Sequence, residues 1–359
     1  MKKRYDSTII LLVLYPYQES EGIRLQKEQL SFDTINQQQA VFGSEDKYIK
    51  LIENNFHVSI VGRDSMLEVT GESAVDVNCV KEVLECMKQL HTGGAALTEE
   101  TVHRLVEECR DGGLDETYKA MQDVVTLTYK HGPVKCKTLG QKNYVKALKE
   151  NVVTFCIGPA GTGKTYLAVA QAAEELKRGE IDKIIMSRPA IEAGEERLGF
   201  LPGDLAQKVD PYLRPLYDAL DDIFGREKSE KHQERGEIEI APLAYMRGRT
   251  LSRARVIIDE SQNASFSTLK MALTRLGEGS KMVLTGDVTQ IDLPRNTDSG
   301  LERCARILGA IDDIAVTKLT NRDVVRNKIV KDIVKAFEKE EERSLARREK
   351  KRGGPVKSR

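Results

Sequence analysis

The chain has 359 residues, with 56 basic and 56 acidic side chains, six cysteines and no tryptophan. This length suggests two domains, each able to bury a core without metal or disulfide cross-links. Hydrophobic residues make up 40% and charged residues 31% of the chain, which is ordinary for a globular protein and excludes a wholly disordered one.

The formal net charge of zero is a sum of regions of opposite sign. Residues 31–120 carry 8 basic and 17 acidic side chains, whereas residues 121–150 carry 6 basic and 2 acidic ones. Residues 343–359 carry 8 basic side chains and one acidic side chain. Because the basic parts would attract a phosphate backbone, the overall balance does not exclude a nucleic-acid partner.

The start of the chain combines a basic cluster with a short apolar run at residues 8–15. That run is shorter than the ~20 residues that span a bilayer, and no small-residue cleavage pattern follows it. We therefore expect a buried strand within residues 1–30, in preference to a targeting segment, and no membrane contact. The cysteines are scattered without a C-x-x-C pair, which favours free thiols in a reducing cytoplasm.

Residues 31–120 are expected to form a small α+β module. Two short segments alternate polar and apolar residues with a period of two, as in a hairpin, and the other segments have helical spacing. These segments lie at residues 47–53, 56–61, 66–70, 75–90 and 98–110. Residues 121–138 contain two short connecting strands.

From residue 139 to residue 337 the pattern changes to strands that alternate with helices. Continuous apolar runs of this kind predict a parallel sheet that is covered on both faces. The runs lie at residues 152–157, 183–187, 255–258, 281–285 and 314–317. Residues 338–359 have almost no large apolar side chains, so a charged, disordered tail is expected there.

A phosphate-binding loop is predicted directly after the first of these strands, where GPAGTGKT matches G-x-x-x-x-G-K-[ST]. In such a loop, backbone N–H groups and the N-terminus of the next helix surround the phosphates of a nucleotide. The lysine reaches the β- and γ-phosphates, and the hydroxyl after it binds Mg²⁺. The candidate ATP-binding residues are Gly158, Pro159, Ala160, Gly161, Thr162, Gly163, Lys164 and Thr165.

Two carboxylates, Asp259 and Glu260, end the apolar run at residues 255–258. We expect Asp259 and Thr165 to hold Mg²⁺, and Glu260 to polarise the attacking water. A strand at residues 183–187 lies between the loop and the acidic pair. This order indicates a RecA-like layout with an inserted strand, and argues against the kinase and GTPase layout.

The next strand, at residues 281–285, ends close to Gln290. A polar group at this position is expected to sense the γ-phosphate.

The order of the motifs resembles the PhoH-like family of bacterial cytoplasmic P-loop ATPases, which are named for phosphate starvation and related to superfamily-one RNA helicases. The motifs run from about residue 40 to residue 337 and are Gly140-Gln141, GPAGTGKT, SRPAIEAG, LGFLPGD, DPYLRPLY, MRGRT, DESQN, TGDVTQ and RDVVR. The resemblance implies that Gln141 reads the adenine edge. It also implies that Arg322 or Arg326 stabilises the transferring phosphate, in cis or from a neighbouring subunit. Arg188 and Pro189 lie where helicases contact nucleic acid.

Four arginines within nine residues, with no acid among them, have the charge pattern that an RNA backbone would prefer. They are Arg247, Arg249, Arg253 and Arg255. The basic tail would add to this surface, and ordinary solvated charge is the alternative interpretation. The resemblance likens the first module to a KH fold, but that module is acidic and lacks a GXXG loop. We therefore expect it to serve interaction or assembly.

Taken together, these features predict a Mg²⁺-dependent ATPase with a RecA-like α/β core, preceded by a KH-like α+β domain. Hydrolysis would drive remodelling of RNA or of a ribonucleoprotein. Only one phosphate loop is present, so a second core for strand separation would have to come from a homo-oligomer. Two alternatives stay open: a nucleotide-gated binding switch with little turnover, and a P-loop kinase.

Overall fold

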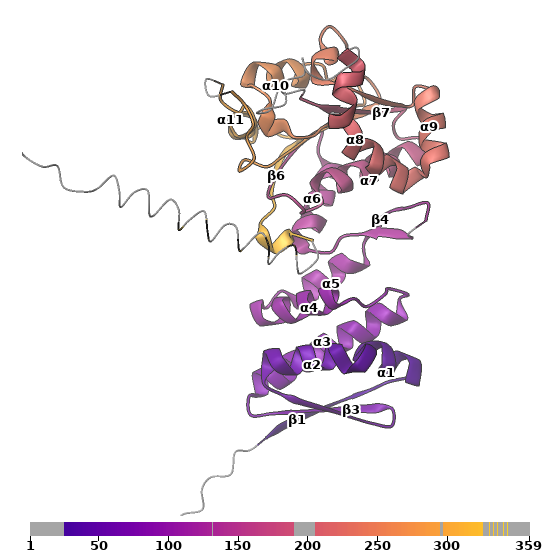
Figure 1. Cartoon of the computed structure of the whole chain (residues 1–359), viewed down its shortest axis with the longest axis vertical. Coiled ribbons are helices and arrows are strands. Elements are labelled where there is room, and N and C mark those ends of the chain that lie inside the picture. Colours follow the sequence, from indigo (N-terminus) through magenta and orange to yellow (C-terminus); the bar gives the residue numbers. More distant parts are fainter. Residues whose placement is uncertain are drawn as a thin grey trace, which may run out of the picture. The chain divides into compact units, whose positions relative to one another are not determined.

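The computed structural model describes residues 25–130, 132–189, 205–294 and 297–325, together with residues 330, 333, 336, 340 and 343. The chain divides into two compact units, residues 1–110 and residues 111–359, and Figure 1 colours them along the sequence. The expectations for residues 1–24, for Arg326 and for most of residues 338–359 lie outside the described part of the chain.

The first unit is a small α+β domain, an antiparallel sheet with helices packed on it (Figure 1). Its strands, in sheet order, are β1 (Gln26–Ser31), β3 (Met66–Gly71) and β2 (Ser59–Arg63). Its helices are α1 (Ile35–Phe42), η1 (Ser44–Asp46), α2 (Lys47–Phe56), α3 (Ala74–Thr92) and most of α4 (Glu99–Asp111). Along β3, Leu67 and Val69 are fully buried and alternate with more exposed residues, as a one-sided sheet requires.

One boundary in this unit differs from the expectation. Residues 56–58 were expected to begin a strand, but Phe56 is the last residue of α2 and the strand starts at Ser59. Phe56 continues the buried stripe formed by Tyr48 and Ile52, at the four-residue spacing of a helix. Burial of that stripe outweighs the local period-two pattern.

A disulfide joins Cys79 on α3 to Cys109 on α4, so the expectation of six free thiols is wrong. The Cα atoms of the pair are 6.0 Å apart, which is within bridging distance. A separation of 30 residues leaves no local motif from which this pairing could be predicted. The other four cysteines are buried and are not in a disulfide, namely Cys86, Cys136, Cys156 and Cys304. The cysteine pattern therefore no longer supports a reducing compartment.

The second unit contains the predicted parallel sheet, with six strands in the order β11-β6-β10-β9-β7-β8. In chain order these strands are β6 (Val153–Ile157), β7 (Lys183–Arg188), β8 (Ile238–Pro242), β9 (Ala254–Ile258), β10 (Lys281–Gly286) and β11 (Ile314–Lys318). Every residue of β6 and β9 is buried, as the continuous apolar runs predict for a sheet covered on both faces.

The RecA-like layout is present, but the inserted strand is a different one from the strand that we expected. In the sheet, β10 separates β6 from β9, whereas β7 lies on the far side of β9. Chain order alone cannot distinguish these positions, because a strand that follows later in the sequence returns to the centre of the sheet.

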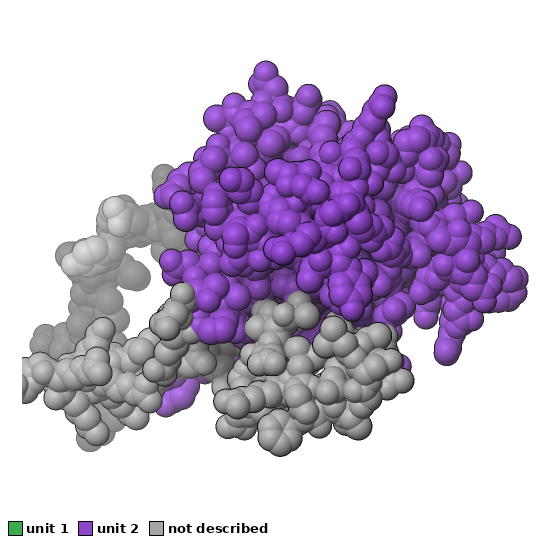
Figure 2. Space-filling model, turned by 90° about the horizontal axis from the view of Figure 1, so that it is seen from above, with its two compact units in different colours: residues 1–110 green, residues 111–359 purple. Residues whose placement is uncertain are grey.

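Helices cover both faces of the sheet, and the described residues of this unit form one closely packed body (Figure 2). One face packs against α6 (Leu139–Glu150), α7 (Lys164–Lys177) and α8 (Leu205–Phe224). The other face packs against α10 (Phe266–Leu273) and α11 (Leu301–Leu308). The remaining elements are α5 (Leu114–Gln122), β4 (Val124–Leu127), β5 (Pro133–Lys135), α9 (Arg226–Glu234), η3 (Leu243–Met246), η4 (Ser261–Asn263) and η5 (Asn321–Asp323).

Because all six strands run in the same direction, their carboxyl ends share one edge of the sheet, the edge at which open α/β sheets bind ligands. The segments that follow β6, β9 and β10 all contain predicted site residues. No helix in the described ranges is both long enough and apolar enough to cross a bilayer.

Candidate nucleotide-binding site

The loop between β6 and α7 has a backbone that only glycine accommodates without strain at several points. Gly161 and Gly163 have φ values of 82° and 78°, in the region that L-residues with side chains rarely adopt. A Cβ at Gly158 would lie 2.7 Å from the carbonyl oxygen of Leu319. The loop opens directly into Lys164, the first residue of α7, so its N–H groups lie at a helix N-terminus and can bind an anion.

Two other parts of the chain hold this loop in place. The N–H of Ala160 donates to Asp287 Oδ2 at 3.0 Å, and the N–H of Val325 donates to the carbonyl oxygen of Gly161 at 2.9 Å. Asp287 follows β10 and also accepts from the Thr289 hydroxyl at 2.7 Å. Hydrogen bonds from the end of β10 and from the segment after η5 therefore preorganise the loop.

Gln141, which was predicted to read the adenine edge, lies on α6 and is almost completely buried. Its Nε2 donates to the carbonyl oxygen of Thr162 at 3.0 Å, and its Oε1 accepts from the N–H of Lys137 at 2.7 Å. Both ends of the amide thus have protein partners, and one of them is the phosphate loop itself. Gln141 supports the loop, and its contact with adenine stays a prediction.

Lys164 lies at the mouth of the loop, where its Nζ donates to the carbonyl oxygens of Gly158 and Pro159 at 2.7 and 2.8 Å. Burial lowers the pKa of the Lys164 amine, and the nearby carboxylates of Asp287 and Glu260 counteract part of that shift. An amine in this position can bind a phosphate oxygen.

Thr165 and Asp259, the two predicted Mg²⁺ ligands, are in direct contact. Asp259 follows β9, is 5% exposed, and accepts from Thr165 Oγ1 at 2.5 Å and from Thr285 Oγ1 at 2.7 Å. In the described ranges no three His, Cys, Asp or Glu side chains form a group that could hold a metal. One carboxylate and one hydroxyl nevertheless suit Mg²⁺, which keeps several waters and takes its other ligands from phosphates.

Glu260, the predicted general base, has its carboxylate held from two sides. Its Oε1 accepts from Arg188 Nη2 at 2.6 Å, and its Oε2 accepts from Gln262 Nε2 at 2.6 Å. Arg188 Nη2 is also 3.4 Å from Asp259 Oδ2, and Nη1 donates to the carbonyl oxygen of Tyr212 at 2.9 Å. The φ of Glu260 is 51°, a strained conformation for a residue with a side chain and one that clusters at functional sites.

Gln262 and Thr285 are site residues that the sequence reasoning missed. Gln262 Nε2 also donates to the carbonyl oxygen of Gln290 at 2.9 Å, and its Oε1 accepts from the N–H of Asp287 at 3.1 Å. Gln290 thus contacts the site through its backbone, and its predicted role as a γ-phosphate sensor stays untested. The available signal was position: Gln262 is two residues beyond Glu260, and Thr285 is a hydroxyl at the carboxyl end of an apolar strand.

Of the two candidate arginines for the transition state, only Arg322 lies in the described part of the chain. It belongs to η5, its side chain is 76% exposed, and it pairs with Asp111 Oδ2 at 3.0 Å. Its neighbour Asp323 accepts from the Thr138 hydroxyl at 2.6 Å, which ties η5 to the start of α6. The catalytic role of Arg322 or Arg326 stays a prediction.

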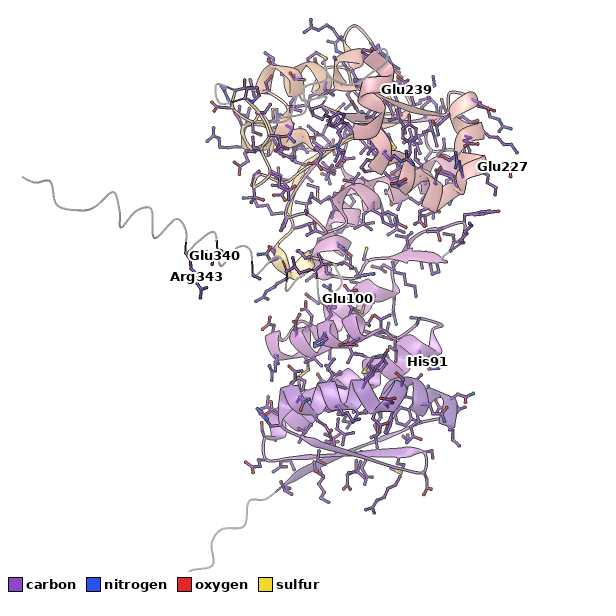
Figure 3. All side chains as sticks on the ribbon, in the orientation of Figure 1. His91, Glu100, Glu227, Glu239, Glu340 and Arg343 are labelled. Atoms are coloured by element: carbon purple, nitrogen blue, oxygen red, sulfur yellow. A yellow bond between two sulfur atoms is a disulfide. The ribbon has the colours of Figure 1, made fainter. Side chains whose placement is uncertain are left out.

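Three of the four arginines predicted to bind RNA form ion pairs within the unit. Arg255 is completely buried and pairs with Glu175 on α7, so the prediction that Arg255 contacts RNA is wrong. Arg249 donates from Nη1 and Nη2 to the two carboxylate oxygens of Glu239 at 2.5 and 2.7 Å. Glu239 lies on β8 (Figure 3).

The other two arginines differ in their surroundings. Arg253 donates to both carboxylate oxygens of Asp182 at 2.6 and 2.9 Å, before the amino end of β9. Arg247 is exposed, and it follows η3, on which the Tyr245 side chain is 54% exposed. This turn begins directly after the carboxyl end of β8, at the same edge of the sheet as the phosphate loop.

Among solved structures, the chain is similar to the SWI2/SNF2 ATPase core of Sulfolobus solfataricus, with 15% identity and a TM-score of 0.29 over 50% of this chain and 43% of that one. It is also similar to the Pif1 helicase of Candida albicans, with 17% identity and a TM-score of 0.26 over 50% and 39% of the two chains.

Sequence comparison gives a closer relationship. Residues 133–338 match the family model described as PhoH-like protein. The chain is 46% identical over 301 residues to a PhoH-like protein of Bacillus subtilis, covering 84% of this chain and 94% of the relative. It is 45% identical over 306 residues to one from Synechocystis, covering 85% and 92%, and 41% identical over 207 residues to Protein PhoH of Escherichia coli, covering 57% and 58%. With this coverage, and with the phosphate loop, Asp259 and Glu260 at one edge of its sheet, the chain belongs to the PhoH-like family.

Proposed function

We propose that the protein binds Mg²⁺ and ATP, hydrolyses the ATP, and uses the reaction to remodel RNA or a ribonucleoprotein. The observation that carries the proposal is the meeting of Lys164, Thr165, Asp259 and Glu260 at the carboxyl edge of the sheet. These four residues come from α7 and from the end of β9, and the 2.5 Å contact between Thr165 and Asp259 joins the two elements.

The loop N–H groups and Lys164 would hold the phosphates, while Thr165 and Asp259 would hold Mg²⁺. When bound, Mg·ATP supplies a phosphoanhydride whose terminal phosphorus is open to attack by water. Glu260 would orient that water and accept its proton. Gln290 and one of Arg322 and Arg326 are proposed phosphate contacts, as the sequence predicts.

An exposed aromatic residue beside an exposed arginine supports RNA as the partner. Leu243 and Met246 of η3 are buried and anchor the turn, and this holds Tyr245 and Arg247 outward. A base can stack on a tyrosine ring while a guanidinium binds the adjacent phosphate. We therefore propose that RNA contacts Tyr245 and Arg247, with the basic tail as a further contact, in place of the complete arginine cluster.

The test is steady-state phosphate release by the wild type, Lys164→Ala and Glu260→Gln, each with and without single-stranded RNA. We expect Lys164→Ala to lose ATP binding, and Glu260→Gln to retain binding but release little phosphate. Wild-type release at the level of Lys164→Ala would refute the hydrolase. Retained ATP binding would then favour the binding switch, and phosphate transferred to an acceptor would favour the kinase.

RNA dependence has its own variant and control. Tyr245→Ala should reduce the stimulation of phosphate release by RNA, because a stacked base contributes about 1–3 kcal/mol of binding. The matched control is Tyr129→Ala, which removes another tyrosine that is 60% exposed in the same unit. Equal effects of the two substitutions would refute the proposal that RNA binds at the turn after β8.

A further inference from the structure

We propose that Arg188 holds Glu260 in an inactive arrangement, and that a phosphate of single-stranded RNA releases Glu260 by taking Arg188 as its own partner. The inference rests on the proposed function for the role of Glu260 as general base. It adds a regulatory connection between the RNA surface and the hydrolytic water. Arg188 is thus a positioning residue that acts through Glu260.

The first support is the arrangement of donors around Glu260. Arg188 Nη2 donates to Glu260 Oε1 at 2.6 Å, and Gln262 Nε2 donates to Glu260 Oε2 at 2.6 Å. A general base needs a carboxylate oxygen within hydrogen-bond reach of the water from which it takes a proton. In this arrangement each oxygen already accepts from a side-chain donor, and the charged guanidinium fixes the direction in which the remaining lone pairs can face a water.

The second support is the difference between these two donors. Gln262 is an uncharged amide that the backbone of Gln290 and the backbone of Asp287 also hold, so an anion has no reason to displace it. Arg188 is a cation with a side chain that is 18% exposed, and Glu260 is 33% exposed. A guanidinium binds phosphate with the same two-pronged geometry as carboxylate. Arg188 is therefore the partner that an incoming phosphate can take.

The third support is the position of Arg188 in the sheet. It is the last residue of β7 and pairs with Pro242, the last residue of β8. The turn with Tyr245 and Arg247 starts immediately after Pro242. Because neighbouring strands are about 4.8 Å apart, an RNA strand stacked on Tyr245 can bring a phosphate to the end of β7. A phosphate from a nucleotide has the same chemistry, and the experiment separates the two sources.

The test is a binding cycle with the full chain and a fluorescently labelled single-stranded RNA, without nucleotide, followed by anisotropy. A fluorescent ATP analogue is titrated separately into the same variants without RNA. The variants are Glu260→Gln, Arg188→Ala and the double variant. Removing the competing carboxylate should tighten RNA binding roughly twofold to tenfold, the range for a partly exposed charged contact. Arg188→Ala should weaken RNA binding, and in its background Glu260→Gln should have no further effect.

The matched control is Asp182→Asn, which removes the carboxylate that pairs with Arg253. Asp182 directly precedes β7, at the opposite end of that strand from Arg188. It should change RNA affinity by less than about twofold. Arg188→Gln is a second variant if Arg188→Ala does not fold, because it keeps a donor for the carbonyl oxygen of Tyr212. Circular dichroism of each variant establishes that it is folded.

Four results would overturn the proposal: unchanged RNA affinity in Glu260→Gln, the same gain when Arg188 is absent, an equal gain in Asp182→Asn, or tighter binding of a fluorescent ATP analogue without tighter binding of RNA. The last result would identify the nucleotide as the phosphate source. Because the RNA cycle is measured without nucleotide, a failure of phosphate release refutes the proposed hydrolase and leaves the competition between Glu260 and RNA for Arg188 standing. Normal phosphate release, together with additive effects of Glu260→Gln and Arg188→Ala on RNA affinity, would support the hydrolase and refute the role of Arg188.

Discussion

Replacing Arg255 with methionine is expected to destabilise the second unit by about 3–5 kcal/mol, because it leaves a buried carboxylate without its cation. The side chains of Arg255 and Glu175 are only 1% and 4% exposed. Arg255 Nε donates to Glu175 Oε2 at 2.8 Å, Nη2 contacts Oε1, and Nη2 also donates to the carbonyl oxygen of Leu148 at 3.0 Å. After the substitution, the Gln171 amide, at 3.1 Å, is the remaining side-chain donor to the Glu175 carboxylate among the described residues.

The double variant Arg255→Met with Glu175→Leu separates the two contributions to this cost. It removes both charges and fills the space with apolar atoms, so it is expected to be close to the wild type in stability, or more stable. Within the described structure Arg255 Nη1 is buried without a hydrogen-bond partner, which further reduces what the intact pair contributes. The single substitution is costly because it leaves the Glu175 carboxylate buried without a cation.

The assay is urea unfolding of the full chain with hydrogen exchange read on peptides from β9 and α7. Local exchange is needed because a chain with two units does not unfold as one two-state system. Arg253→Met is the matched control, since Arg253 and Asp182 are 57% and 56% exposed and such an exposed pair contributes little to stability. A loss below about 1 kcal/mol in Arg255→Met, or a double variant as unstable as the single one, would refute the reasoning.

Three further outcomes are expected. The hydrogen bond from Arg249 lowers the pKa of Glu239. The stability from this pair is therefore present at neutral pH and is lost as the pH falls below the ordinary glutamate value of about 4.3 through the lowered pKa. Arg249→Gln should consequently show a smaller drop in Tm on acidification than the wild type. Alkylation in denaturant without reductant should label four cysteines by mass spectrometry, and six after reduction of the bond between Cys79 and Cys109; six at both steps would contradict that bond. Gln141→Ala should weaken ATP binding about fivefold by calorimetry, the effect of one lost hydrogen bond of about 1 kcal/mol to the loop.

The residues that follow β6 and β9 could be predicted from sequence because their chemistry is local. The glycines of the phosphate loop, Lys164 and Thr165 form one contiguous motif, and Asp259 ends an unmistakable apolar strand. That Thr165 and Asp259 lie at the same edge also follows from sequence, once the strands are assigned to a parallel sheet with shared carboxyl ends. Their direct contact depends in addition on strand order, because only β10 separates β6 from β9.

The partners of Glu260 depend on strand order, and sequence reasoning could not supply them. Arg188 lies 72 residues before Glu260, and only the adjacency of β7 and β9 in the sheet brings the two side chains together. The same limit applies to Cys79 and Cys109, which are on separate helices. A motif can identify a reactive group. The groups that hold it in place come from other elements, and tertiary packing decides which elements become neighbours.

The arginines show how the direction of the strands alone could have refined the prediction of RNA binding. Arg253 and Arg255 lie at the amino end of the strand that Asp259 terminates, so a parallel sheet places them at the edge opposite the phosphate loop. Arg247 follows a different strand, β8, and lies beyond its carboxyl end. In the sequence these arginines form one cluster of charge. In the sheet the direction of the strands places them at opposite edges. An RNA strand that controls Glu260 must bind at the carboxyl edge, where Arg247 lies and where Arg253 and Arg255 do not.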